Sequence, residues 1–256
     1  YFSKERRNHF LCKRNSEHMK LDILAFGAHP DDVELGAGGI LAVHATAGKK
    51  IGIVDLTRGE MGTRGTPELR DEEAKEAGLI LGCLIRENLA FSDGKIPTDH
   101  ESQIKVAEVI RKYQPEVVLM NAPTDRHPDH GRASQLVEEA CFLSGLHKLE
   151  VSAAFKGLLP WRPKQMYKYL QFYNLEPNLV VDITTGFEAK MAAILAHKSQ
   201  FYNPKSSEPE TVIASKGFLD SVEARAMDWG RVIGSKYAEP LISVRHIGVE
   251  NLLDLR

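Results

Sequence analysis

Short apolar runs recur along the chain, separated by longer stretches that mix apolar and polar residues. A strand buried on both faces reads as a continuous apolar run of this length, whereas a half-buried strand alternates. The runs predict strands at residues 21–26, 50–56, 88–91, 116–120 and 178–183, and an edge strand at residues 241–246.

The mixed stretches carry signals that start and stop helices. Thr66 and Pro67 suit the beginning of one helix, and two other segments have the spacing of a capping box, Thr98–Glu101 and Thr185–Glu188. We expect helices at residues 38–47, 67–81, 131–144 and 212–232, and two helices that follow the capping boxes and end near residues 113 and 198. Residues 57–66 are predicted to be a glycine-rich polar loop, and residues 203–210 a mobile loop.

This alternation of strand and helix predicts an α/β fold: a Rossmann-like, mostly parallel sheet with helices on both faces and the active site at the carboxyl ends of the strands. No repeat or linker interrupts residues 19–256, so a single domain is expected there. Residues 1–18 are basic and polar and lack the apolar core of a secretory signal. We expect Met19 to be the natural start and residues 1–18 to be a peripheral leader or an expression remnant, with a basic anchoring arm as the alternative.

Composition narrows the choice of partners. The formal net charge is −2 and the hydrophobic fraction is 43%, so charge favours neither nucleic acid nor an anionic membrane as a partner. No apolar run approaches the roughly 18 residues that a membrane-spanning helix needs. Three widely spaced cysteines, Cys12, Cys83 and Cys141, predict no disulfide framework and a reducing, cytoplasmic setting.

Two histidine–aspartate clusters each follow a predicted strand. Residues 29–32 read His-Pro-Asp-Asp, and residues 127–130 read His-Pro-Asp-His. Because ligands bind at the carboxyl ends of strands in such folds, we expect one shared site. His29, Asp32 and His130 would supply two imidazoles and one carboxylate, the donor set of catalytic zinc with a fourth position left for water.

The remaining members of the clusters suggest acid–base roles. Asp31 is the candidate general base for the attacking water, and His127 could polarise a carbonyl and protonate a leaving amine. Asp129 could hydrogen-bond a histidine ring and fix its tautomer. Either cluster alone would more simply be a turn, because Pro and Asp are turn residues. The occurrence of both, each beyond an apolar strand, favours the metal site.

A competing motif is Gly36-Ala37-Gly38-Gly39, which follows a strand as a dinucleotide-binding loop would, with Asp55 as a candidate ribose ligand. Leu41 stands where the third glycine belongs, so close packing of a helix on the sheet explains these glycines better. Neither a G-x-S-x-G elbow nor a Walker lysine motif occurs. A non-catalytic module that binds sugar or metal is a further alternative.

The motifs resemble those of the LmbE-like (PIG-L) zinc-dependent N-acetylglucosamine deacetylases. The resemblance begins near Lys20, extends to the C-terminus, and rests on residues 28–32 with Glu34 and Gly36, residues 57–62, Arg70-x-x-Glu73-Ala74, and residues 127–130. Residues 167–172, 181–183 and 197–200 look most similar to the branch that deacetylates N-acetyl-α-glucosaminyl L-malate in bacillithiol biosynthesis, while chitooligosaccharide-type and mycothiol-type branches share the metal core.

The resemblance implies one zinc ion per chain on His29, Asp32 and His130, although other divalent metals suit such ligands. It also implies that Asp31, His127 and Asp129 are the catalytic residues. Substrate contacts are implied at three further positions, with Arg70 a candidate clamp for a malate carboxylate; these positions are Glu60, Arg70 and Asp93. The family further implies an acetamido-sugar substrate and a homo-oligomer, a trimer or a hexamer.

Overall fold

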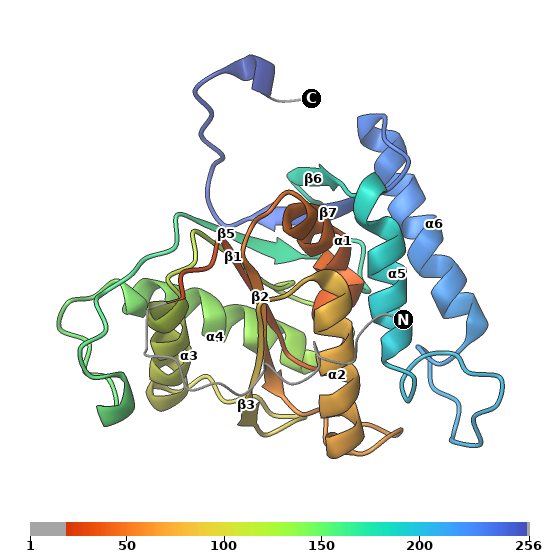
Figure 1. Cartoon of the computed structure of the whole chain (residues 1–256), viewed down its shortest axis with the longest axis horizontal. Coiled ribbons are helices and arrows are strands. Elements are labelled where there is room, and N and C mark those ends of the chain that lie inside the picture. Colours follow the sequence, from red (N-terminus) through yellow and green to blue (C-terminus); the bar gives the residue numbers. More distant parts are fainter. Residues whose placement is uncertain (1–18, 255–256) are drawn as a thin grey trace, which may run out of the picture.

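The computed structural model describes residues 19–254, so the expectations for residues 1–18 concern residues outside this range. Seven strands form one sheet in the order β3-β2-β1-β4-β5-β7-β6 (Figure 1). The strands are β1 (Ile23–Gly27), β2 (Ile51–Thr57), β3 (Ile85–Phe91), β4 (Val117–Asn121), β5 (Gln165–Tyr169), β6 (Leu179–Asp182) and β7 (Ala238–Ser243).

The first five strands are parallel to one another, and β7 runs antiparallel to both of its neighbours, β5 and β6. The predicted fold class is therefore confirmed. The prediction of an edge strand near residues 241–246 was wrong, because β7 lies inside the sheet and β6 forms the edge. Ala238 and Leu241 are almost fully buried, which is what an interior strand requires.

Six α-helices connect the strands of the described chain, and three short 3₁₀ helices occur at Ala153–Phe155, Thr184–Gly186 and Leu252–Asp254. None of the helices in residues 19–254 is long and apolar enough to span a membrane. The α-helices are α1 (Asp32–Thr46), α2 (Pro67–Leu81), α3 (His100–Tyr113), α4 (Pro128–Ser144), α5 (Phe187–Ala196) and α6 (Lys216–Ile233).

The ends of these helices test the capping predictions. Thr66 accepts a hydrogen bond from the Leu69 amide, so the predicted start of α2 is confirmed. The prediction of a capping box at Thr98 was wrong, because the side chain of Asp99 caps α3 instead. The box at Thr185 was also wrong: Gly186 occupies the cap position of α5 and contributes no side-chain hydrogen bond.

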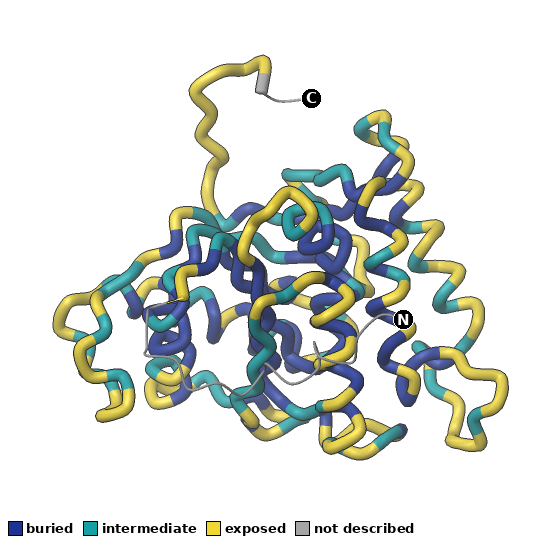
Figure 2. Tube along the Cα trace, viewed as in Figure 1, coloured by how far each residue is buried: buried dark blue, intermediate teal, exposed yellow. Residues whose placement is uncertain are grey.

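Two layers of helices cover the sheet. One apolar core lies between the sheet and α3 and α4, and the other lies between the opposite face and α1, α2 and α5. Figure 2 shows the buried sheet inside an exposed outer surface. Gly36 and Gly39 allow α1 to approach closely, since an added Cβ would lie 2.2 Å from the Tyr169 ring and 2.5 Å from the Ile183 side chain.

The sheet topology also fixes where ligands can bind. The chain leaves β1 toward β2 on one side, whereas β4 pairs with β1 on the other side. The loops after β1 and β4 therefore diverge and leave a crevice at the carboxyl ends of these strands, the usual ligand site of an open α/β sheet. The two histidine–aspartate clusters occupy these two loops. Both helices that follow start earlier than predicted, because the clusters themselves supply the first turns of α1 and α4.

Candidate metal centre and active site

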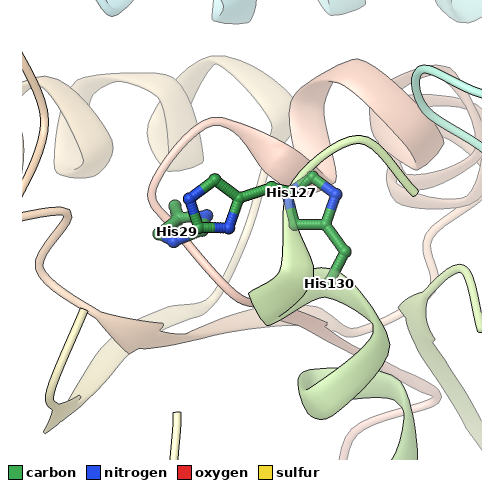
Figure 3. A group of neighbouring side chains, drawn as sticks. All are labelled: His29, His127 and His130. Atoms are coloured by element: carbon green, nitrogen blue, oxygen red, sulfur yellow. The ribbon is translucent and has the colours of Figure 1, made fainter. Parts of the chain in front are cut away.

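Three histidine rings converge at the crevice between β1 and β4. Ring nitrogens of His29, His127 and His130 all lie within 4.8 Å of one another. Figure 3 shows the three rings gathered together, with His130 on the first turn of α4. The ring centroids of His29 and His127 are 4.6 Å apart, and those of His29 and His130 are 5.7 Å apart. Histidines about 100 residues apart in sequence thus meet as expected.

The carboxylate of Asp32 lies between two of these rings. One oxygen is 3.2 Å from Nε2 of His130, and the other is 3.6 Å from Nδ1 of His29. Two ligand atoms on a tetrahedral zinc ion with bonds of about 2.0 Å would lie about 3.3 Å apart. Each of these two distances suits a pair of atoms that share one small divalent cation, and the three histidines, with one ring nitrogen each, form a group that could hold a metal ion.

Asp32 is held in place by two amides that the sequence analysis missed. Asn121, the last residue of β4, donates to Oδ2 of Asp32 at 3.0 Å, and Gln171 donates to Oδ1 at 2.8 Å. The side-chain oxygen of Asn121 also accepts a hydrogen bond from the Ala28 amide. The position of Asn121 at the end of an apolar strand was a usable signal, because ligand-binding groups collect there.

The outer nitrogens of two rings are bound to carboxylates. Nδ1 of His130 donates to Asp125 at 3.0 Å, and Nε2 of His29 donates to Asp93 at 2.9 Å. Carboxylates in this position fix the tautomer of a metal-binding histidine and raise its basicity. Burial alone would lower the pKa of His130, but Asp32 and Asp125 outweigh it and raise this pKa to about 9. The nitrogens that face Asp32 are thus oriented toward one point.

Asp31 is buried beside the candidate metal ligands and has an unusual backbone conformation. Its φ of 119° lies in a region that residues other than glycine rarely adopt, and such strain occurs where a side chain must be held for function. Burial raises the pKa of Asp31 to about 6, although the positive charge of Arg70 acts in the opposite direction. A carboxyl group with this pKa can accept a proton near neutral pH and release it again.

Arg70 is buried rather than solvated. Its guanidinium donates to the carbonyl oxygens of Gly59 and Pro30 at 2.8 Å and lies 3.4 Å from Asp31. An added Cβ at Gly59 would lie 1.8 Å from the guanidinium, and the φ of this residue is +66°, so only glycine allows the approach. Arg70 thus links the glycine-rich loop to the first histidine–aspartate cluster.

His127 occupies the cap position of α4 and is half-buried. Its Nδ1 accepts a hydrogen bond from the backbone amide of Asp129 at 3.2 Å, so the ring proton resides on Nε2. Burial lowers the pKa of His127, and repulsion from His29 and His130 lowers it further. A neutral ring with a proton on Nε2 can donate a hydrogen bond.

The side chain of Asp129 is bound to groups other than the ring of His127. One of its oxygens accepts hydrogen bonds from the Ile96 amide and from Arg132. The other is buried, has no hydrogen-bond partner among residues 19–254, and lies 3.8 Å from Nε2 of His29. The structure places Asp129 beneath His29, where its charge favours the protonated outer nitrogen of that ring.

The other two substrate-contact candidates lie close together. Asp93 is almost fully buried and binds both His29 and the Met61 amide. Glu60 is exposed and accepts a hydrogen bond from the Asp93 amide. Asp93 lines the cavity described below, whereas Glu60 and Asp129 do not. The substrate contacts of Glu60, Arg70 and Asp93 stay predictions.

A buried ionic network beneath α1 was also missed. Arg86 forms ion pairs with Glu34 and Asp55, and His197 lies 3.0 Å from Glu34. Although burial opposes ionisation, Arg86 and His197 lower the pKa of Glu34 to about 2. Asp55 is thus bound to Arg86, and the glycines at residues 36–39 pack inside α1, so neither serves a dinucleotide site.

A cavity of about 1100 Å³ opens above the candidate metal ligands. Its floor contains Asp31, Asp32 and the three histidines, and one wall is formed by α6. The fold and this histidine–carboxylate floor define an α/β protein with a metal-capable site at the switch point of its sheet.

Comparison with known proteins identifies the family. The family model described as PIG-L, GlcNAc-PI de-N-acetylase, matches residues 24–141. Diacetylchitobiose deacetylase from Thermococcus kodakarensis is 33% identical over 228 residues, which cover 85% of this chain and 80% of that protein. The chain therefore belongs to the PIG-L family, as its motifs indicated.

Two further proteins are similar over most of their length. The crystal structure of the conserved protein TT1542 from Thermus thermophilus has a TM-score of 0.79 and 38% identity, covering 90% of this chain and 98% of that chain. A probable N-acetyl-alpha-D-glucosaminyl L-malate deacetylase 2 from Bacillus cereus is 26% identical over 195 residues, 71% of this chain and 84% of that protein.

Proposed function

We propose that this protein is a metal-dependent hydrolase that removes the acetyl group from N-acetylglucosaminyl conjugates. The observation that carries the proposal is the position of Asp32 between His29 and His130, with Asp31 beside it on the floor of a large cavity. The names of the relatives support deacetylation as the reaction.

We assign the metal to His29, Asp32 and His130, and zinc is the proposed ion because two imidazoles and a carboxylate are its usual catalytic ligands. A divalent cation here would supply a Lewis acid and a water of lowered pKa. The outer nitrogens of His29 and His130 remain bound to Asp93 and Asp125, so both rings keep their orientation during turnover.

The protein's own groups then provide the proton transfers. Asp31 accepts the proton of the attacking water, and Arg70 holds its carboxylate in place. His127 donates a hydrogen bond from Nε2 to the acetamide oxygen as negative charge develops there. Asp129 helps to orient two imidazole rings. Its backbone amide donates a hydrogen bond to His127, and its carboxylate lies beneath His29. Asp31 then passes the proton taken from the water to the sugar nitrogen as the C–N bond breaks, so the sugar leaves as the free amine and the acetyl group leaves as acetate.

Two conjugates are candidate substrates. N-acetylglucosaminyl malate, the bacillithiol precursor, agrees with the sequence motifs and with the relative from Bacillus cereus. Arg126, exposed at the mouth of the cavity with its guanidinium 5.1 Å from the Phe172 ring, could bind a malate carboxylate. A chitooligosaccharide agrees with the relative from Thermococcus kodakarensis. We further propose that the protein is cytoplasmic and forms a homo-oligomer.

Release of free amine and acetate from these conjugates tests the proposal. Zinc-loaded protein should deacetylate at least one of N-acetylglucosaminyl malate, diacetylchitobiose and N-acetylglucosamine. Asp31→Asn should bind zinc normally and lose turnover by about 10²–10⁴-fold. Bound zinc with no amine released from any of the three would instead favour a module that binds sugar without hydrolysing it.

A further inference from the structure

One wall of the cavity is a face of α6 that carries an apolar stripe beside polar and charged side chains. Phe218, Val222, Arg225 and Trp229 of α6 line the cavity at spacings of four, three and four residues, which places them on one side of the helix. In a surface helix such an apolar stripe normally faces the protein interior. Along the whole of α6, however, only Ala226 and Gly230 are buried, while Phe218, Val222 and Trp229 are half-buried and Phe218 stacks on Phe201.

This wall belongs to the same cavity as the metal ligands. The lining continues from His29 and Asp32 past Gly36 to Trp229 and Pro240. Typical pockets for drug-sized ligands measure about 300–1000 Å³, so a cavity of about 1100 Å³ is larger than one acetamido-sugar needs. A group attached to that sugar would therefore meet α6.

The charged side chains near α6 already have partners. Lys190 forms an ion pair with Glu239 at 2.5 Å, and Asp228, which lines the cavity on α6, pairs with Arg231 at 2.9 Å. Arg225 donates to the carbonyl oxygens of Gln171 and Tyr173. A dicarboxylate at this wall would have to compete with these internal contacts, whereas an uncharged ring would not.

A second cation lines the cavity farther along, in the loop between β2 and α2. Arg64 is bound to Glu208 and Ser206, so its charge is balanced from within the protein as well. Arg126, which lies beside His127, is the cation that an anionic substrate would reach. Within residues 19–254, the α6 wall therefore presents apolar side chains and charges that are already paired, whereas the mouth of the cavity presents the exposed cation Arg126.

We propose that Phe218, Val222 and Trp229 form a subsite for an uncharged second sugar ring joined to the N-acetylglucosamine unit. The flat face of a pyranose presents C–H groups that pack on an indole ring, and its hydroxyl groups remain available to polar side chains such as Ser221. The subsite rests on the proposed function, and it assigns disaccharide selectivity to α6.

The test compares Trp229→Ala with the wild type on diacetylchitobiose and on N-acetylglucosamine. We expect KM for the disaccharide to rise about tenfold with kcat little changed, and the kinetics on the monosaccharide to stay the same. Trp229→Phe should restore most of the affinity. Met227→Ala is the matched control, because Met227 is 49% exposed on the same helix and does not line the cavity.

Equal losses on both sugars, or no loss on either, would overturn the subsite. A wild-type preference for N-acetylglucosaminyl malate over the disaccharide would overturn it as well. Calorimetric binding of diacetylchitobiose to the zinc-loaded Asp31→Asn protein, with and without Trp229→Ala, separates the two proposals. A loss of affinity for diacetylchitobiose on Trp229→Ala supports the subsite even if the wild type releases no acetate. An unchanged affinity contradicts the subsite.

Discussion

The carboxylate of Asp125 accepts a hydrogen bond from Nδ1 of His130 at 3.0 Å, which turns Nε2 of that ring toward Asp32. Asp125 is itself held by the backbone amides of Phe172 and Tyr173, so the orientation of His130, the proposed metal ligand on α4, depends on the loop after β5. Removing this charge should weaken metal binding without removing a ligand.

We expect Asp125→Asn to lower zinc affinity about 10–100-fold, measured by competition with a chromogenic chelator. His130→Ala should lower it much further, because a ligand itself is lost. Asp220→Asn, at an exposed residue of α6 that does not line the cavity, is the control and should bind zinc as the wild type does. Unchanged affinity in Asp125→Asn would show that His130 needs no carboxylate to orient it.

The pKa of Asp31 predicts the acid limb of the pH profile. A general base must be ionised, so kcat/KM should fall about tenfold per pH unit below about 6 and level off above it. The charge of Arg70 lowers this pKa. Arg70→Met should therefore move the acid limb to higher pH, whereas Arg58→Met, at a partly exposed ion pair with Asp71 of α2, should leave it in place. An acid limb that does not move would show that the charge of Arg70 does not lower the pKa of Asp31.

The buried network of Arg86, Glu34 and Asp55 should be sensitive to the loss of its arginine. Arg86→Met leaves two buried carboxylates without their cation, so the free energy of unfolding should fall by about 3–5 kcal/mol in denaturant titrations. The partly exposed pair of Arg58 and Asp71 is the comparison, and Arg58→Met should cost much less, because solvent screens that pair. Similar losses in the two variants would contradict a special role of burial.

Two glycines in helices should respond oppositely to alanine. In Gly39→Ala the new methyl group would lie 2.5 Å from Ile183, so overpacking should destabilise the fold by about 1–3 kcal/mol. In Gly217→Ala, in the first turn of α6, the methyl group meets no atom of the described residues within 4 Å. Helix propensity should make that variant equally stable or more stable by up to about 1 kcal/mol. Thermal unfolding of both variants, measured side by side, tests this difference in sign.

The metal centre could be predicted in part because its chemistry is local in sequence. His29 and Asp32 lie in one turn, and the position of both clusters after apolar runs placed them at the same edge of a parallel sheet. Asp125 and Gln171 could not be assigned this way. Each reaches the site from a loop whose path depends on tertiary packing, and neither belongs to a short recognisable motif.

The same limit explains the errors in the elements. The start of α1 was placed at residue 38 because Gly36, Gly38 and Gly39 weaken a helical pattern, yet buried contacts with Tyr169 and Ile183 favour small residues there. The position of β7 inside the sheet could not be predicted from the sequence either. Hydrophobicity indicates that a segment is a strand, but it does not identify the strand's neighbours.

Because β7 lies between β5 and β6, the order of synthesis limits when the sheet can form completely. During synthesis β6 emerges from the ribosome more than 50 residues before β7, the strand through which it joins the sheet. Until residues 238–243 arrive, the buried ammonium of Lys190 also lacks its partner Glu239. The nascent chain can thus assemble β1 to β5 first, and the side of the cavity formed by β7 closes only after residues 238–243 have been synthesised.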